Sequence, residues 1–114
     1  NDSVSFTVDL LKKEVLNTFT LGCITSSGMA IHKPVTVNVE ISDDNCNFKK
    51  VGTLNFTSQE VFREGNFIED LALEMGGVQA RYVRVTAKGP GVCPEGHVRP
   101  GQEARILFDE MMIE

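Results

Sequence analysis

The side chains best suited to binding a ligand gather in one unusual segment, residues 88–101. Glu95, His97 and Arg99 alternate there among four glycines and three prolines. Prolines fix the backbone and glycines permit unusual angles, so such a loop can hold these side chains at low entropic cost. Arginine and glutamate would give charge-assisted hydrogen bonds to sugar hydroxyls. The alternative is a structural arch over one end of the fold, with residues 92–93 tucked beneath it.

The sequence contains two histidines, His32 and His97, and both fall in long predicted connections. Two histidines make a poor metal site unless a third ligand joins them. Each imidazole can therefore be a hydrogen-bonding group for a polar ligand such as a sugar, or simply a solvated or locally bonded side chain.

Sugar recognition usually combines an aromatic face with a few placed polar groups. The sequence has no tryptophan and one tyrosine. Phe62 and Phe67 are the aromatic residues nearest the long connections, although either can instead be a core or capping residue. The same region offers polar groups, and the candidate binding set is His97, Arg99, Glu95, His32, Arg63, Asn66 and Phe62.

Catalytic motifs are missing from the sequence. There is no nucleophile elbow, phosphate-binding loop or His-Glu-x-x-His helix. Asp109 and Glu110 are adjacent, so on a strand they point to opposite faces and cannot serve one site together. Asp43 and Asp44 lie in a turn, where hydrogen bonding to the local backbone explains them. We therefore predict that this domain is not an enzyme.

The bulk composition restricts the class of protein. The chain of 114 residues predicts one domain, residues 1–114, and 41% hydrophobic residues favour a folded chain. Its formal charge is −5 and its basic residues are scattered, which argues against binding nucleic acid or anionic membrane surfaces. No apolar run approaches the ~20 residues that span a bilayer, so membrane insertion is not expected. The chain starts abruptly, as in an excised or mature fragment.

Three cysteines, Cys23, Cys46 and Cys93, lie far apart in the sequence. Their spacing excludes a zinc ribbon and a Cys-x-x-Cys redox motif, and their odd number leaves at least one thiol unpaired. Two of the three could form one disulfide in an oxidising compartment. We expect Cys23 to be a buried, inert thiol because it ends an apolar strand.

Alternation of apolar and polar residues is the main structural signal, and it predicts strands. It is clear in four segments and less regular in three more, which gives seven strands in all: 4–10, 15–23, 35–41, 51–56, 71–75, 83–87 and 106–113. One helical turn is expected after Thr57, which forms a capping box with Glu60. Since no segment carries a sustained helical stripe, we predict an all-β sandwich.

Connection lengths then locate a binding end. If consecutive strands run antiparallel, the connections alternate between the two ends of the sandwich. The long ones, residues 25–33, 57–66 and 89–104, would all lie at the same end. Binding residues favour loops on a rigid scaffold, so this end is the candidate site. The alternative is that these connections are long without having a binding function.

Several segments resemble one known family. Val-Ser-Phe-Thr-Val-Asp-Leu at 4–10, Pro-Val-Thr-Val-Asn-Val-Glu-Ile-Ser-Asp-Asp at 34–44 and Ala-Arg-Tyr-Val-Arg-Val at 80–85 resemble strands of discoidin-like, coagulation-factor C-type domains. The Pro-Glu-Gly-His loop and Ala-Arg-Ile-Leu-Phe-Asp-Glu-Met at 104–111 are similar to the C-terminal module of bacterial family 20 hexosaminidases. The resemblance covers essentially the whole chain, and its last thirty or so residues are the most specific.

The resemblance implies a galactose-binding-like jelly-roll sandwich that is a non-catalytic, carbohydrate-binding-type module. Its expected partners are a hexosamine- or galactose-containing glycan and the catalytic domain of an exported N-acetylhexosaminidase, in the periplasm or on the bacterial surface. The alternative is an interdomain module that stabilises the parent enzyme without binding sugar. Glu110 matches a calcium-ligand position of relatives, so a structural calcium ion is the one cofactor implied. The upstream segment that completes that calcium site in relatives does not precede Val4 here, and Gly96 replaces an aromatic residue.

Overall fold

Two long antiparallel strands organise the computed structural model, which describes residues 3–95, 97 and 101–114. β1 (Ser3–Ser26) pairs with β4 (Asn66–Lys88) along almost its full length. The remaining strands are β2 (Thr36–Ser42), β3 (Lys49–Asn55) and β5 (Phe108–Ile113), and the sheet order is β3-β2-β4-β1-β5. The helical segments are η1 (Ser27–Met29) and α1 (Ser58–Val61), and no helix of the described part is long and apolar enough to cross a membrane.

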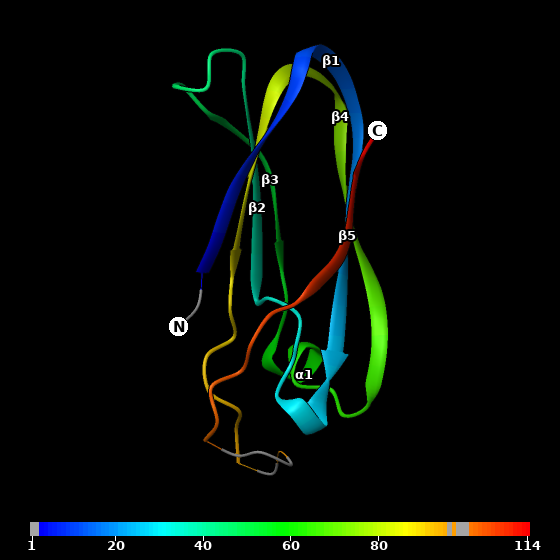
Figure 1. The fold of residues 1–114 in the computed structure, drawn as a ribbon, viewed down its shortest axis with the longest axis vertical. Coiled ribbons are helices and arrows are strands. Elements are labelled where there is room, and N and C mark those ends of the chain that lie inside the picture. The colour runs from blue at the N-terminus through cyan, green and yellow to red at the C-terminus, as the bar shows by residue number, and fades with distance from the viewer. Residues whose placement is uncertain (1–2, 96, 98–100) are drawn as a thin grey trace.

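The β1–β4 pair bends sharply and folds this single sheet over on itself (Figure 1). The pairing shifts between Asp9 and Glu14, where β1 carries extra residues, and again between Leu16 and Thr18, where β4 does. Such bulges bend strands and increase their twist. Leu11 in β1 and the pair Gly76–Gly77 in β4 have positive φ angles at this bend. The two halves of the sheet therefore face each other as the layers of a sandwich.

The predicted all-β sandwich is confirmed, but the prediction of seven separate strands is wrong. The expected turns at residues 11–14 and 75–77 are bends within β1 and β4, so four predicted strands merge into two. Alternation restarts in a new phase after a bulge, which in a sequence is indistinguishable from a hairpin turn.

The core lies between the two layers and draws on both. Phe19 comes from one layer, and Val37, Val39, Val83 and Val85 come from the other; all are fully buried. Burying one such side chain stabilises a fold by roughly 1.5–3 kcal/mol. As predicted, Cys23 is buried in this core as well, and burial raises the pKa of its thiol to about 12.

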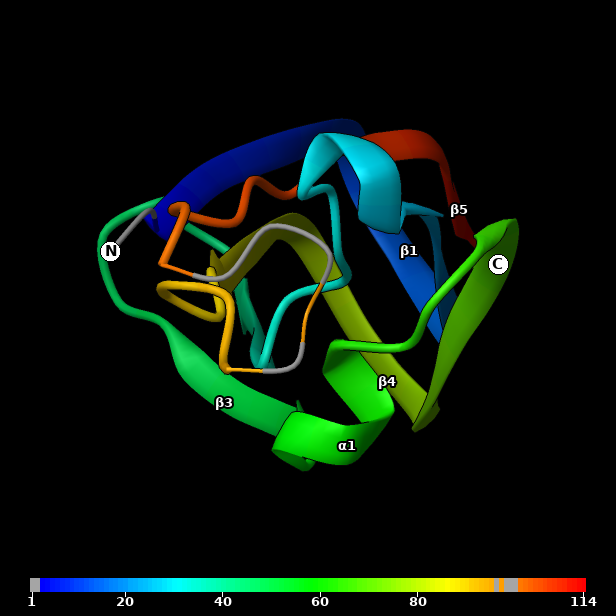
Figure 2. The ribbon, with the colours of Figure 1, turned by 90° about the horizontal axis from the view of Figure 1, so that it is seen from below.

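The three long connections meet at one end of the sandwich, at the bottom of Figure 1 and facing the viewer in Figure 2. The β1–β4 bend lies at the opposite end. This arrangement agrees with the alternation of ends inferred from connection lengths, because the chain reverses direction at the bend as it would at a hairpin. The short connection after β2 is a turn in which the Asp44 carboxylate accepts hydrogen bonds from the backbone of Cys46 and Asn47, as the turn interpretation predicts.

Candidate functional site

Hydrogen bonds of backbone groups and of the Ser27 hydroxyl join the connections at this end into one framework. Ser27 donates its N–H to the Gly65 carbonyl over 3.0 Å, and the Ser27 hydroxyl accepts from the Gly65 N–H over 2.8 Å. Ile31 forms bridges to Ser26 and to Arg105, which ties the connection after β1 to the one before β5. Loops paired in this way can hold a binding site in place.

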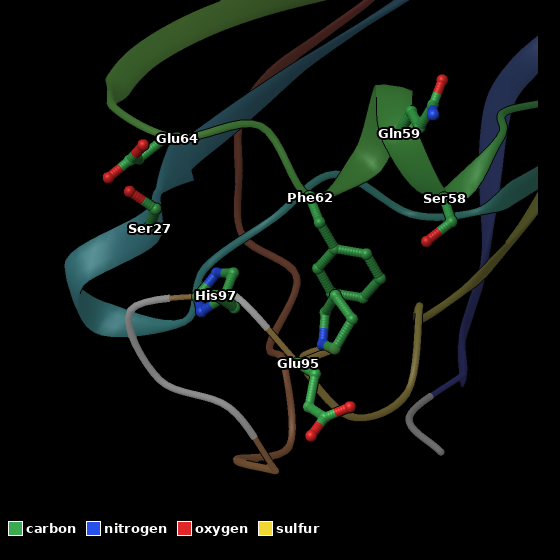
Figure 3. Close-up of a pocket in the computed structure, with 8 residues that line it drawn as sticks. Ser27, Ser58, Gln59, Phe62, Glu64, Glu95 and His97 are labelled. Carbon is green, nitrogen blue, oxygen red and sulfur yellow. The ribbon is translucent and has the colours of Figure 1, made fainter.

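A pocket of about 300 Å³ opens among these connections. Figure 3 shows side chains from three separate segments around it, with the Phe62 ring between the α1 residues and Glu95 in this view. The lining residues are Ser27, Ser58, Gln59, Phe62, Glu64, Pro94, Glu95 and His97.

The short helix α1 places one wall of the pocket. As predicted, a capping box starts it: the Thr57 hydroxyl accepts from the Glu60 N–H, and the Glu60 carboxylate accepts from the Thr57 N–H over 2.9 Å. The hydrogen bond from the Thr57 N–H to the Glu60 carboxylate is the main cause of the lowered pKa of Glu60. Four residues make too few internal bonds to form a stable helix alone, so the cap fixes where Ser58 and Gln59 lie.

His32 lies behind this wall and is completely buried. Its Nδ1 is 2.9 Å from the Val61 carbonyl oxygen, and its Nε2 is 2.8 Å from Nε2 of His97. A carbonyl only accepts, so Nδ1 of His32 carries the proton, Nε2 presents a lone pair, and His97 donates to it. Burial is the main cause of the lowered pKa of His32, which keeps the ring neutral.

Phe62 packs edge-on against both imidazoles. Its ring centroid is 5.1 Å from that of His32 and 6.1 Å from that of His97. Phe62 also contacts a small buried cluster of Ala30, Cys93 and Ala104. One aromatic ring therefore joins the pocket to the packed interior of this end.

Cys93 completes a group of three metal-ligating side chains. Its sulfur and the ligating nitrogens of His32 and His97 all lie within 4.8 Å of one another. Burial raises the pKa of the Cys93 thiol. The sequence analysis considered Cys93 as part of a structural arch and as a possible disulfide partner, not as a metal ligand. The structure buries Cys93 but exposes Val92. The signal that could have found this group is the Cys-x₃-His spacing of Cys93 and His97.

Four of the predicted binding residues come together. Glu95, His97 and Phe62 line the pocket, and His32 supports His97 from behind. Arg63 is exposed and lies 4.5 Å above the Phe67 ring, outside the pocket.

Two further candidates, Asn66 and Glu110, lie away from the pocket. Asn66 accepts a hydrogen bond from the Ser26 hydroxyl and borders a separate shallow hollow beside Phe67. Glu110, the predicted calcium ligand, is exposed on β5 opposite Gly22. Arg99 and the neighbouring Gly96 lie outside the described residues.

The sequence analysis missed five lining residues: Ser27, Ser58, Gln59, Glu64 and Pro94. Serine and glutamine occur on every protein surface, so their types carried no signal. Their positions did carry a signal, because Ser58 and Gln59 are in the capped turn just before Phe62, and Pro94 adjoins Glu95.

The lining offers hydrogen-bonding groups of both kinds around an aromatic ring. Ser27 is already bonded to Gly65. Ser58, Gln59, Glu64 and Glu95 make no side-chain hydrogen bond within residues 3–95, 97 and 101–114. Two carboxylates, an amide and a hydroxyl can therefore accept from or donate to a polar ligand.

Comparison with known proteins gives a structural likeness only. No protein-family model matches this sequence, and a search of curated proteins finds no match. Among solved structures, the C-terminal domain of a chitobiase from Bacteroides fragilis matches with a TM-score of 0.52 and 20% identity. The likeness covers 100% of this chain and 66% of that one, so this chain spans just under two thirds of its length. The discoidin-like assignment stays a prediction, and the chain shares the overall fold of that chitobiase domain.

Proposed function

We propose that this chain is a non-catalytic accessory module of an exported N-acetylhexosaminidase, and that it holds glycan in the loop-end pocket. The carrying observation is the lining, in which Phe62 is joined by Ser58, Gln59, Glu64 and Glu95, whose side chains make no hydrogen bond within the described part of the chain. A sugar ring has an apolar face and a rim of hydroxyls, and such a pocket matches both.

The fold and the setting of the pocket support this proposal. The similar solved structure is the C-terminal domain of a chitobiase, and the tail resembles modules of family 20 hexosaminidases. Fold alone does not carry function, so the pocket chemistry is the main argument. A parent enzyme of this class would place the module in the periplasm or on the cell surface of a bacterium.

A second candidate, an interdomain module that binds no sugar, is favoured by one observation. His32 is completely buried, and its two ring nitrogens form hydrogen bonds with the Val61 carbonyl and with His97. Two of the candidate binding residues thus serve the stability of this end, whatever the pocket holds.

The test compares Gln59→Ala in the pocket with Gln79→Ala at the far end of the sandwich. Both glutamines are exposed, so neither change should alter folding. Losing one hydrogen bond worth about 1–1.5 kcal/mol should weaken binding roughly 10-fold. Binding is measured on an array of N-acetylhexosamine and galactose glycans, followed by titration calorimetry with the best ligand. Glu95→Gln, paired with Glu14→Gln at the bend, repeats the comparison for a charged group.

The proposal requires wild type and Gln79→Ala to bind alike and Gln59→Ala to bind less. No retention of any glycan by the wild type would favour the interdomain candidate. Equal loss in both glutamine variants would move the sugar away from the pocket. Turnover of a chromogenic hexosaminide by the wild type would contradict the non-catalytic assignment.

A further inference from the structure

We propose that His32, Cys93 and His97 form a three-ligand Zn²⁺ site at the inner side of the pocket. The three ligating atoms lie within 4.8 Å of one another, and they come from two different connections. This inference shares His97 with the pocket lining but does not rest on sugar binding, because it is argued from the three donor atoms.

His32 is oriented as metal-binding histidines are. Its Nδ1–H donates to the Val61 carbonyl over 2.9 Å, which fixes the ring and leaves Nε2 as the lone-pair nitrogen. Histidines that ligate metals almost always make such an outer hydrogen bond with their other nitrogen. Nε2 of His32 points toward Nε2 of His97, and the proposed ion would bind both nitrogens.

The donors are already close to the separations that zinc requires. Zinc–nitrogen bonds near 2.0–2.1 Å at a tetrahedral angle place two imidazole nitrogens about 3.4 Å apart, and a zinc-bound sulfur about 3.6 Å from each. The two Nε2 atoms are 2.8 Å apart, and no pair of donors exceeds 4.8 Å. The ion would therefore take the place of the histidine–histidine hydrogen bond after a shift of the order of 1 Å.

The donor types and their spacing favour zinc. One thiolate and two imidazoles suit Zn²⁺, while calcium and magnesium take oxygen ligands. Cys93 and His97 are separated by three residues, within the range of ligand pairs in zinc sites. Three protein ligands leave the fourth tetrahedral position to water or to a bound molecule.

Protons balance when the ion binds. The Cys93 thiol loses its proton to solvent and its sulfur bonds Zn²⁺, while the His97 proton moves from Nε2 to Nδ1 through solvent. The His32 tautomer does not change. Binding of one Zn²⁺ thus releases one proton. The site would also tie the connection before β5 to the one after β1.

Zinc binding is tested on protein without a histidine tag, kept reduced. Zn²⁺ should bind one per chain in competition with a chromophoric chelator, and the Tm should rise with Zn²⁺ concentration. Co²⁺ is the spectroscopic substitute. It should give a thiolate-to-cobalt charge-transfer band and the visible absorption of tetrahedral cobalt.

Cys93→Ser and the exposed Cys46→Ser form the matched pair of variants. Cys93→Ser should lose the charge-transfer band and Cys46→Ser should keep it. His97→Gln, at a half-buried position, is a second ligand variant whose fold is checked by circular dichroism in chelator. Each ligand variant should weaken Zn²⁺ binding by more than the roughly 10–100-fold caused by losing an outer-shell partner.

The proposal is overturned if Zn²⁺ leaves the Tm of the wild type unchanged, or if the cobalt band depends on Cys46. Copper binding with no zinc response would overturn the choice of metal. Glycan binding is measured in chelator as well, so loss of the metal site and loss of the sugar site give different results.

Discussion

At the scale of single residues, His32 links the interior to the pocket. It is fully buried, yet both ring nitrogens have partners, and so the cost of burying a polar ring is offset. The same hydrogen bonds fix a neutral tautomer, because the Val61 carbonyl takes the one ring proton. Protonating Nε2 would set a second N–H against the N–H of His97.

The native state should therefore be less stable in weak acid. The pKa of His32 is lowered from 6.5 in the fold. Between the lowered pKa and 6.5, the unfolded chain therefore binds a proton on His32 that the native state does not bind. The free energy of unfolding should fall as the pH drops below about 6.5, toward the lowered pKa. Urea unfolding between about pH 7.5 and 5.5, in chelator, measures this above the range where carboxylates titrate.

His32→Gln serves as the control for that experiment. The variant should be less stable at every pH and should show a shallower dependence on pH in this window. A wild-type slope retained in full by His32→Gln would assign the effect to other groups.

At the scale of elements, α1 shows how a single turn can carry a binding wall. Its four residues owe their geometry to the capping box and to packing of Val61, which is 1% exposed. Ser58, Gln59 and Phe62 take their positions in the pocket from this turn. The cap therefore links local sequence directly to the shape of the site.

Removing the cap should damage both stability and binding. Thr57→Ala deletes the hydroxyl that accepts from the Glu60 N–H, and should cost about 1 kcal/mol of unfolding free energy. Thr57→Ser keeps a hydroxyl and should stay near wild type. Urea unfolding of both variants gives the comparison, and an equal loss in both would mean that the hydroxyl does not hold the turn.

At the scale of the whole molecule, one bend turns a single sheet into a sandwich. Without it, β1 and β4 would form an extended, twisted ribbon with both faces in water. The bend brings their two halves face to face, and it sends the chain back to the end where the connections meet (Figure 1). Core and pocket thus depend on the same feature.

The bend can be probed at Gly77. Its φ is +75°, and an added Cβ would meet nothing closer than the Asn17 side chain at 3.7 Å. Gly77→Ala should therefore cost about 1 kcal/mol through backbone strain and not through a clash. Gly28→Ala, which has open space and no positive φ, should be near neutral in the same thermal unfolding measurement. Equal Tm values for the two variants would contradict a strained bend.

The sequence by itself determined the local features. Alternating residues gave the strands of an all-β sandwich, and Thr57 with Glu60 gave the capped turn, because both depend on neighbours a few residues apart. It also placed Glu95, His97 and Phe62 in connections that share one end, since strand direction alternates.

Only the tertiary structure decided the rest. It merged predicted strands into β1 and β4, because a bulge and a turn look alike along the chain. It also set Cys93 beside His32, sixty-one positions away, and brought Ser58 and Gln59 into the same pocket lining as Glu95. Contacts between distant segments depend on how the loops pack. The spacing of residues along the sequence does not reveal how far apart two loops lie in space.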